Sequence, residues 1–196
     1  MLAFCLSAAM SLTLAAGATP IARPGRAEVE VRLRANTLPA SATDWRALGT
    51  GVDEILIAIA GDPKADLQLR AHAVSALAYV STRPGRAFLE AVVKAKASSK
   101  DAGDKLLLRN AALALGWAGG TTVPAQLGLL LEHPDPDVRI DVAIGLGLTR
   151  SEQAADLLRK RFDVETVPKV RSQIGRQLGL IEDAAAEAKR PSPAAE

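Results

Sequence analysis

The chain has 196 residues, of which 48% are hydrophobic and only 3% aromatic, and its formal net charge is +2. This length allows a single domain. With so few aromatic side chains, the core must consist mainly of Ala, Leu, Val and Ile, which suits closely packed helices. The nearly balanced charge gives no overall bias toward nucleic acid or membrane surfaces, whose binding proteins normally carry a basic face. We therefore expect no nucleic-acid partner.

The first 18 residues are uncharged, apolar and rich in small side chains, and they end in Ala16-Gly17-Ala18. This pattern is typical of an export signal cleaved before Thr19, and the run is too short and too rich in small residues for a confident membrane span. The first basic residue is Arg23, so the usual positive start is missing, and a retained N-terminal membrane anchor is the alternative. The expected location is the periplasm or the exterior of a bacterial-type cell, with no stable membrane insertion after cleavage.

Cys5 is the only cysteine, so the chain from Thr19 onward has no disulfide and no thiolate nucleophile. Residues 19–42 are rich in Pro, Arg and Ala, and only residues 27–33, AEVEVRL, alternate as a strand would. We expect residues 19–42 to form an extended N-terminal segment.

Regular structure is expected over residues 43–183, starting with Thr43 as the N-cap of a short helix that carries Trp45. Residues 52–60 form the next predicted helix, although their apolar run would also suit a buried strand. The repeated combination of a capping Asp with a following Pro, or a capping Thr, then predicts further helix starts. These helices are expected at 63–80, 84–93, 105–118, 123–131, 136–148, 152–162 and 168–182. Residues 184–196 are polar and alanine-rich, with two prolines, and are expected to be a disordered tail.

A sequence pattern recurs at a fixed period. Leu-Gly occurs at Leu115, Leu146 and Leu178, at steps of 31 and 32 residues, and Leu77-Ala78 precedes them by 38 residues. An arginine stands seven residues before the leucine in three of these units, as Arg70, Arg139 and Arg171. Such a period predicts a solenoid of helical pairs, and the arginines are expected to bridge neighbouring repeats through Asp66, Asp137 or Asp141.

The unit DPDVR at Asp135 to Arg139, with Val142-Ala143 and Leu146-Gly147, resembles HEAT repeats, in particular the short HEAT-like class also found in phycobilisome lyases. The resemblance covers roughly residues 45–182. It implies an all-α fold, an α–α superhelix of about four helical pairs plus a terminal helix. It does not identify a function, because such repeats occur in enzymes, scaffolds and adaptors alike.

No catalytic or metal-binding constellation is evident. His72 and His133 belong to different repeats and lack neighbouring ligands at metal-site spacing. Asp135 and Asp137 resemble an acid pair, but carboxylates at a helix start are expected to cap it. We expect no enzyme activity, no metal and no cofactor.

The favoured function is an exported, non-enzymatic scaffold or adaptor whose second helices line a shallow concave surface that binds another protein or peptide. A lyase-like or chaperone factor is the alternative that the resemblance implies. A HEAT-like DNA glycosylase is less favoured because Trp45 and Trp117 lie in distant repeats and no basic face is evident. The candidate protein-binding residues are those expected to be exposed on the second helices: Arg86, Glu90, Lys94, Gln126, Gln153, Asp156, Arg159 and Lys160.

Overall fold

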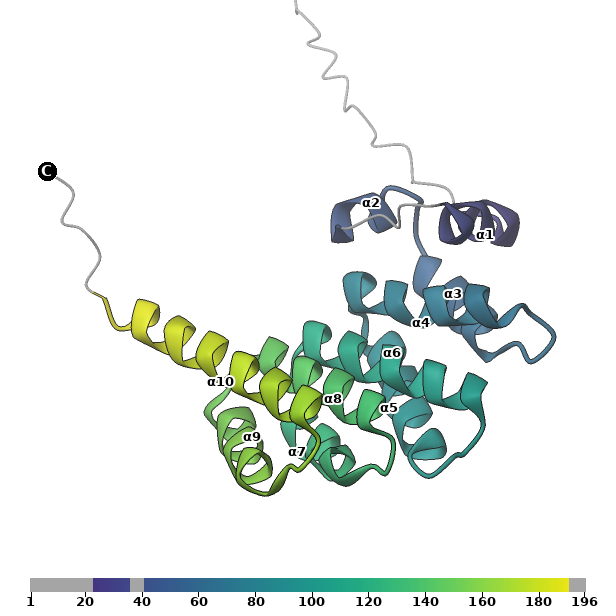
Figure 1. Cartoon of the computed structure of the whole chain (residues 1–196). Coiled ribbons are helices and arrows are strands. Elements are labelled where there is room, and N and C mark those ends of the chain that lie inside the picture. The colour runs from purple at the N-terminus through teal and green to yellow at the C-terminus, as the bar shows by residue number, and fades with distance from the viewer. Residues whose placement is uncertain (1–22, 36–40, 191–196) are drawn as a thin grey trace, which may run out of the picture.

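The computed structural model describes residues 23–35 and 41–190, and within these residues every regular element is helical (Figure 1). This confirms the predicted all-α fold. The predicted leader, residues 1–18, lies outside the described residues. The elements are α1 (Arg26–Arg34), α2 (Ala42–Arg46), α3 (Val52–Gly61), α4 (Leu67–Val80), α5 (Arg83–Lys96), α6 (Ala102–Ala118), α7 (Val123–Gly128), the 3-10 helix η1 (Leu129–Glu132), α8 (Pro136–Thr149), α9 (Glu152–Val164) and α10 (Pro168–Ala188).

The helices form two layers. In Figure 1, α4, α6, α8 and α10 lie side by side in one layer, and α5, α7 and α9 lie in the other. Each pair, such as α4 with α5 or α8 with α9, contributes one helix to each layer, and α10 is the terminal helix that packs against α8 and α9. We call the surface formed by α5, α7 and α9 the second-helix face. This arrangement is the predicted solenoid of helical pairs.

Glycines allow α6 and α8 to approach each other closely. A Cβ atom on Gly145 would lie 2.6 Å from the backbone oxygen of Ala112, and one on Gly116 would overlap the backbone of Gly145. A Cβ atom on Gly147 would instead meet the side chain of Gln177 of α10. The repeated glycine therefore reflects the contact between one repeat and the next.

The N-terminal segment was predicted to be extended, and that prediction is wrong for residues 26–34, which form α1. The alternating pattern would place Val29, Val31 and Leu33 on one face of a strand. In the helix, Val29 and Leu33 are four residues apart and fully buried, whereas Val31 is 72% exposed. The side chain of Glu30 further stabilises α1 by pairing with Arg26 and Arg34, one turn away on either side.

Several helix ends differ from the predicted boundaries because other side chains cap them. Ser41, not Thr43, caps α2, and Asp66 caps α4 by accepting hydrogen bonds from the amides of Gln68 and Leu69. α6 begins at Ala102, three residues earlier than predicted, with Asp101 as its N-cap. α10 continues to Ala188, so residues 184–188 of the predicted disordered tail are helical; residues 191–196 lie outside the described part.

The expected arginine ladder is not formed. Arg70 donates to the backbone oxygen of Ala60, Arg171 lies over the ring of Phe162, and Arg139 pairs with Glu165. Other cations link the repeats instead, at 2.5 to 2.8 Å between charged atoms: Lys105 with Asp135, Arg109 with Asp141, and Lys169 with Asp137. Arginines with the same sequence spacing therefore have different structural roles.

Within the described residues, no helix is both long and apolar enough to span a membrane.

Candidate protein-binding groove

A groove runs between α5 and the segment formed by α7 and η1 on the second-helix face. α3 packs against α5, and α7 packs against α9, but α5 and α7 barely contact each other. The residues of α5 that face the gap include Ala87, Ala91 and Val93, and Ala97 follows the helix. Because alanine side chains are too small to fill the gap, a groove of about 540 Å³ remains, a volume within the usual range of ligand-binding pockets.

Leucines form the opposite wall of the groove. Leu129 and Leu130 are the first two residues of η1, the 3-10 helix that follows α7 without a break and precedes α8 of the next repeat. Leu130 is buried, but Leu129 is 81% exposed, the highest value among the large exposed apolar side chains of the described residues. An apolar side chain exposed beside an apolar groove is typical of an interaction surface.

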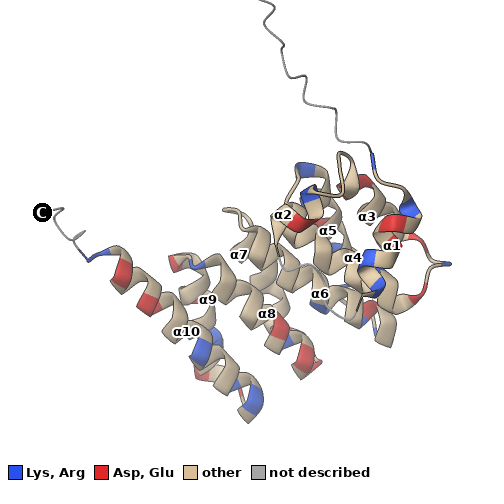
Figure 2. Ribbon diagram, turned by 90° about the horizontal axis from the view of Figure 1, so that it is seen from above, with Lys and Arg blue, Asp and Glu red and all other residues tan. Residues whose placement is uncertain are grey.

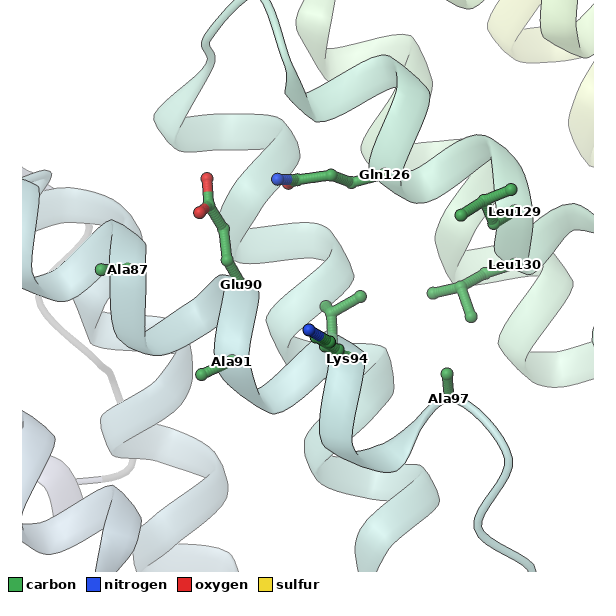
Figure 3. Close-up of a pocket in the computed structure, with 9 residues that line it drawn as sticks. Ala87, Glu90, Ala91, Lys94, Ala97, Gln126, Leu129 and Leu130 are labelled. Carbon is green, nitrogen blue, oxygen red and sulfur yellow. The ribbon is translucent and has the colours of Figure 1, made fainter.

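Three polar side chains of the groove were among the sequence-predicted candidates. Glu90 and Lys94 lie one turn apart on α5, and Gln126 lies on α7. In Figure 3, the amide end of Gln126 points toward the carboxylate of Glu90 across one end of the groove. Since α7 itself has no charged residue (Figure 2), Glu90 and Lys94 supply the formal charges of the groove lining.

The other candidates lie elsewhere. Arg86 is half-buried rather than exposed: its guanidinium donates to the backbone oxygens of Ala118 and Gly119, so it caps the end of α6. Arg159 pairs with Asp156 and with Glu182 of α10. Gln153 lines a separate small pocket, and Lys160 is exposed on α9. The structure therefore brings together Glu90, Lys94 and Gln126 at the groove and places the remaining five outside it.

Sequence reasoning missed the apolar part of the groove. Leu129, Leu130 and Leu131 form a leucine run in a short helix, and such a helix cannot bury three consecutive leucines on one side. That run was a usable signal for an exposed apolar side chain. The alanines of α5 gave no such signal, because alanine is equally common where two helices pack closely and leave no groove.

The first-helix layer also has an apolar hollow. Tyr79 and Trp117 lie with their ring centroids 5.9 Å apart, beside Leu113 and Leu148. Trp117 is 57% exposed. The volume of this hollow, about 320 Å³, is smaller than that of the groove on the second-helix face. The residues that line the hollow include no charged side chain.

The titratable side chains that resembled catalytic groups have structural partners. His133 accepts a hydrogen bond from the Asp135 amide, and His72 Nδ1 lies 2.8 Å from the Leu33 carbonyl oxygen. A hydrogen bond from Lys105 lowers the pKa of Asp135 against the opposing effect of burial, and Asp135 accepts from the amide of Asp137. In the described part of the chain, no three His, Cys, Asp or Glu side chains come together in a metal-binding group.

Comparison with known families agrees with this geometry. The family model of HEAT repeats matches residues 96–179, which extend from the end of α5 into α10. This part of the chain is therefore similar to HEAT repeats, as its sequence motifs indicate. A search of curated proteins found no match.

Proposed function

We propose that the protein is a non-enzymatic scaffold or adaptor that binds another protein through the groove between α5 and α7. HEAT repeats generally serve as surfaces for protein–protein interaction. The observation that carries the proposal is the groove itself: an apolar surface with an 81% exposed leucine at its edge and a small number of polar groups at one end.

The apolar lining also favours a polypeptide partner. Interfaces gain most of their binding energy from a few apolar or aromatic side chains that enter a pocket and lose their contact with water. The groove offers such a pocket, and its open side leaves room for the backbone that carries the entering side chain. The expected role is therefore binding without chemical conversion of the partner.

We place this scaffold in the periplasm or outside a bacterial-type cell, on the basis of residues 1–18. An N-terminal membrane anchor is the alternative location. In either case the HEAT-like repeats face an exported partner.

Filling the groove tests the proposal. Ala91→Leu adds a side chain to the groove lining, whereas Ala95→Leu makes the same change at an exposed position of α5 that does not line it. We expect the wild type and Ala95→Leu to capture the same protein from an extract of the source cell and Ala91→Leu to lose it. Both variants should keep the helical circular dichroism spectrum and melt within a few degrees of the wild type. Equal capture by all three proteins would show that binding, if any, uses another surface.

A further inference from the structure

The groove contains a carboxylate that lacks a partner. In the described part of the chain, Glu90 is half-buried but makes no ion pair and accepts no hydrogen bond. Every other buried or half-buried carboxylate has at least one such partner: Glu30, Asp53, Asp62, Asp104, Asp135, Asp137, Asp141 and Glu165. The other unpaired acids, such as Glu132 and Glu152, are exposed to solvent. Glu90 is thus exceptional, since polar groups withdrawn from water normally have a partner.

A second unsatisfied acceptor lies at the same end of the groove. The Oε1 atom of Gln126 is buried and receives no hydrogen bond. The amide end of Gln126 points toward Glu90 (Figure 3). Rotation of the terminal amide exchanges Oε1 and Nε2 at little steric cost, so a donor placed in the groove would satisfy both Glu90 and Gln126. An unmade hydrogen bond is costly to leave buried, and an occupant that supplies it gains affinity.

We propose that the groove binds a segment of another protein in which an arginine lies beside an aliphatic side chain. The guanidinium would donate to the Glu90 carboxylate and to Oε1 of Gln126, and the aliphatic side chain would contact Leu129 and Leu130. This inference rests on the proposed function and specifies its partner.

Arginine fits the groove better than lysine for two reasons. Its planar guanidinium has five N–H donors in a fixed fork and can serve two acceptors at once, whereas the lysine ammonium is a compact, strongly hydrated charge. Its aliphatic stem can lie along apolar surface while its head remains polar. Ala87 and Ala91, next to Glu90 on α5, provide such a surface.

Lys94 sets the direction in which the segment binds. It lies one turn from Glu90 along α5, toward Ala97, and has no ion pair in the described part of the chain. A like charge disfavours a basic side chain at that end of the groove. The arginine should therefore occupy the Glu90 end, and removal of the Lys94 charge should not weaken binding.

Selection from a library of random heptapeptides displayed on phage tests the proposal. The purified chain is the bait, and Ala91→Leu, with the groove filled, is used to remove peptides that bind elsewhere. Selected peptides are then synthesised, and their affinities for the wild type, Glu90→Gln and Lys94→Gln are measured by fluorescence anisotropy. We expect peptides with an arginine next to Leu, Ile or Val, and we expect Glu90→Gln to weaken them about tenfold or more, as truncation of a buried charge pair does. Lys94→Gln should bind them as tightly as the wild type or more tightly.

The remaining outcomes contradict either this inference or the proposed function. Peptides that lack basic residues, or that bind Glu90→Gln as tightly as the wild type, would overturn the arginine assignment while leaving the groove as the binding surface. If no peptide binds the wild type at all, the arginine assignment is overturned. If peptides bind the wild type but depletion on Ala91→Leu removes every one of them, the groove is not the binding surface, and both proposals fail.

Discussion

Arg139 and Glu165 form the most deeply buried ion pair among the described residues, with side chains 8% and 0% exposed. Two guanidinium nitrogens of Arg139 donate to the two carboxylate oxygens of Glu165, each at 2.9 Å. Arg139 also donates to the carbonyl oxygens of His133 and Pro134, while Glu165 accepts from Arg161 and from the Val167 amide. The pair thus joins α8 to the turn between α9 and α10.

The stability of the fold should depend on the ionisation of Glu165. Burial raises the pKa of Glu165, but hydrogen bonds from Arg139, the Val167 amide and Arg161 outweigh it and lower the pKa to about 2, from 4.5 in the unfolded chain. A lowered pKa in the folded state stabilises the protein above the unfolded pKa, and this stabilisation is lost as the pH falls. We expect Glu165 to contribute roughly 3 kcal/mol that disappears between about pH 4.5 and pH 2.

Urea unfolding at a series of pH values measures this contribution, with Glu165→Gln as the comparison. Glu165→Gln should be less stable than the wild type at pH 7, and the difference should shrink as the pH approaches 2. A difference that stays constant over that range would show that the ionisation of Glu165 does not drive it.

At the scale of the helix, the start of α8 was easier to predict than the partner of its arginine. Asp135 caps α8 and Pro136 follows it, as their sequence order indicates, because both effects are local to the helix start. The partner of Arg139 was mispredicted because Glu165 lies 26 residues away in the sequence, whereas the prediction considered aspartates closer to the repeated arginines. α1 was missed because the alternation of Val29, Val31 and Leu33 is equally compatible with a helix that buries two of the three.

The Leu-Gly motif predicts a difference between internal and terminal repeats. Gly116 of α6 faces the backbone of α8, whereas Gly179 of α10 belongs to the last repeat, where an added Cβ atom would meet no neighbouring atom within 4 Å. Gly116→Ala should cost about 1 to 3 kcal/mol, because the added methyl group forces α6 and α8 apart. Gly179→Ala should instead stabilise the protein by about 0.5 to 1 kcal/mol, since alanine is the better residue within a helix.

Thermal melting of the two variants gives the comparison directly. The two substitutions add the same methyl group within a helix, so their effects on helix propensity should be similar and only their surroundings differ. If Gly116→Ala melts at or above the temperature of the wild type, the close contact between α6 and α8 is not the reason for the recurring glycine.

At the scale of the whole molecule, the repeat period predicted the stacked helical pairs, but it could not predict the groove. The period follows from contacts that each repeat shares with the next, so it is visible in the sequence as recurring Leu and Gly. The groove depends instead on a difference between repeats: α7 is short and tightens into η1, and α5 presents alanines to it. Glu90, Lys94 and Gln126 were recognised as candidates on the second helices. That they line one groove could be seen only from the positions of α5 and α7 in the structure.

The proposed location makes a prediction that is independent of the groove. Cleavage before Thr19 would remove the apolar leader and leave every described residue, from Arg23 onward, in the mature protein. Expression of the whole chain in a bacterium should therefore give a shortened product in the periplasmic fraction, and N-terminal sequencing should find Thr19 or a residue close to it at its start. A variant with Ala16→Leu and Ala18→Leu should remain uncleaved, because signal cleavage requires small side chains at these two positions. An intact N-terminus on cytosolic wild-type protein would contradict export, whereas an intact N-terminus in the membrane fraction would favour the retained anchor.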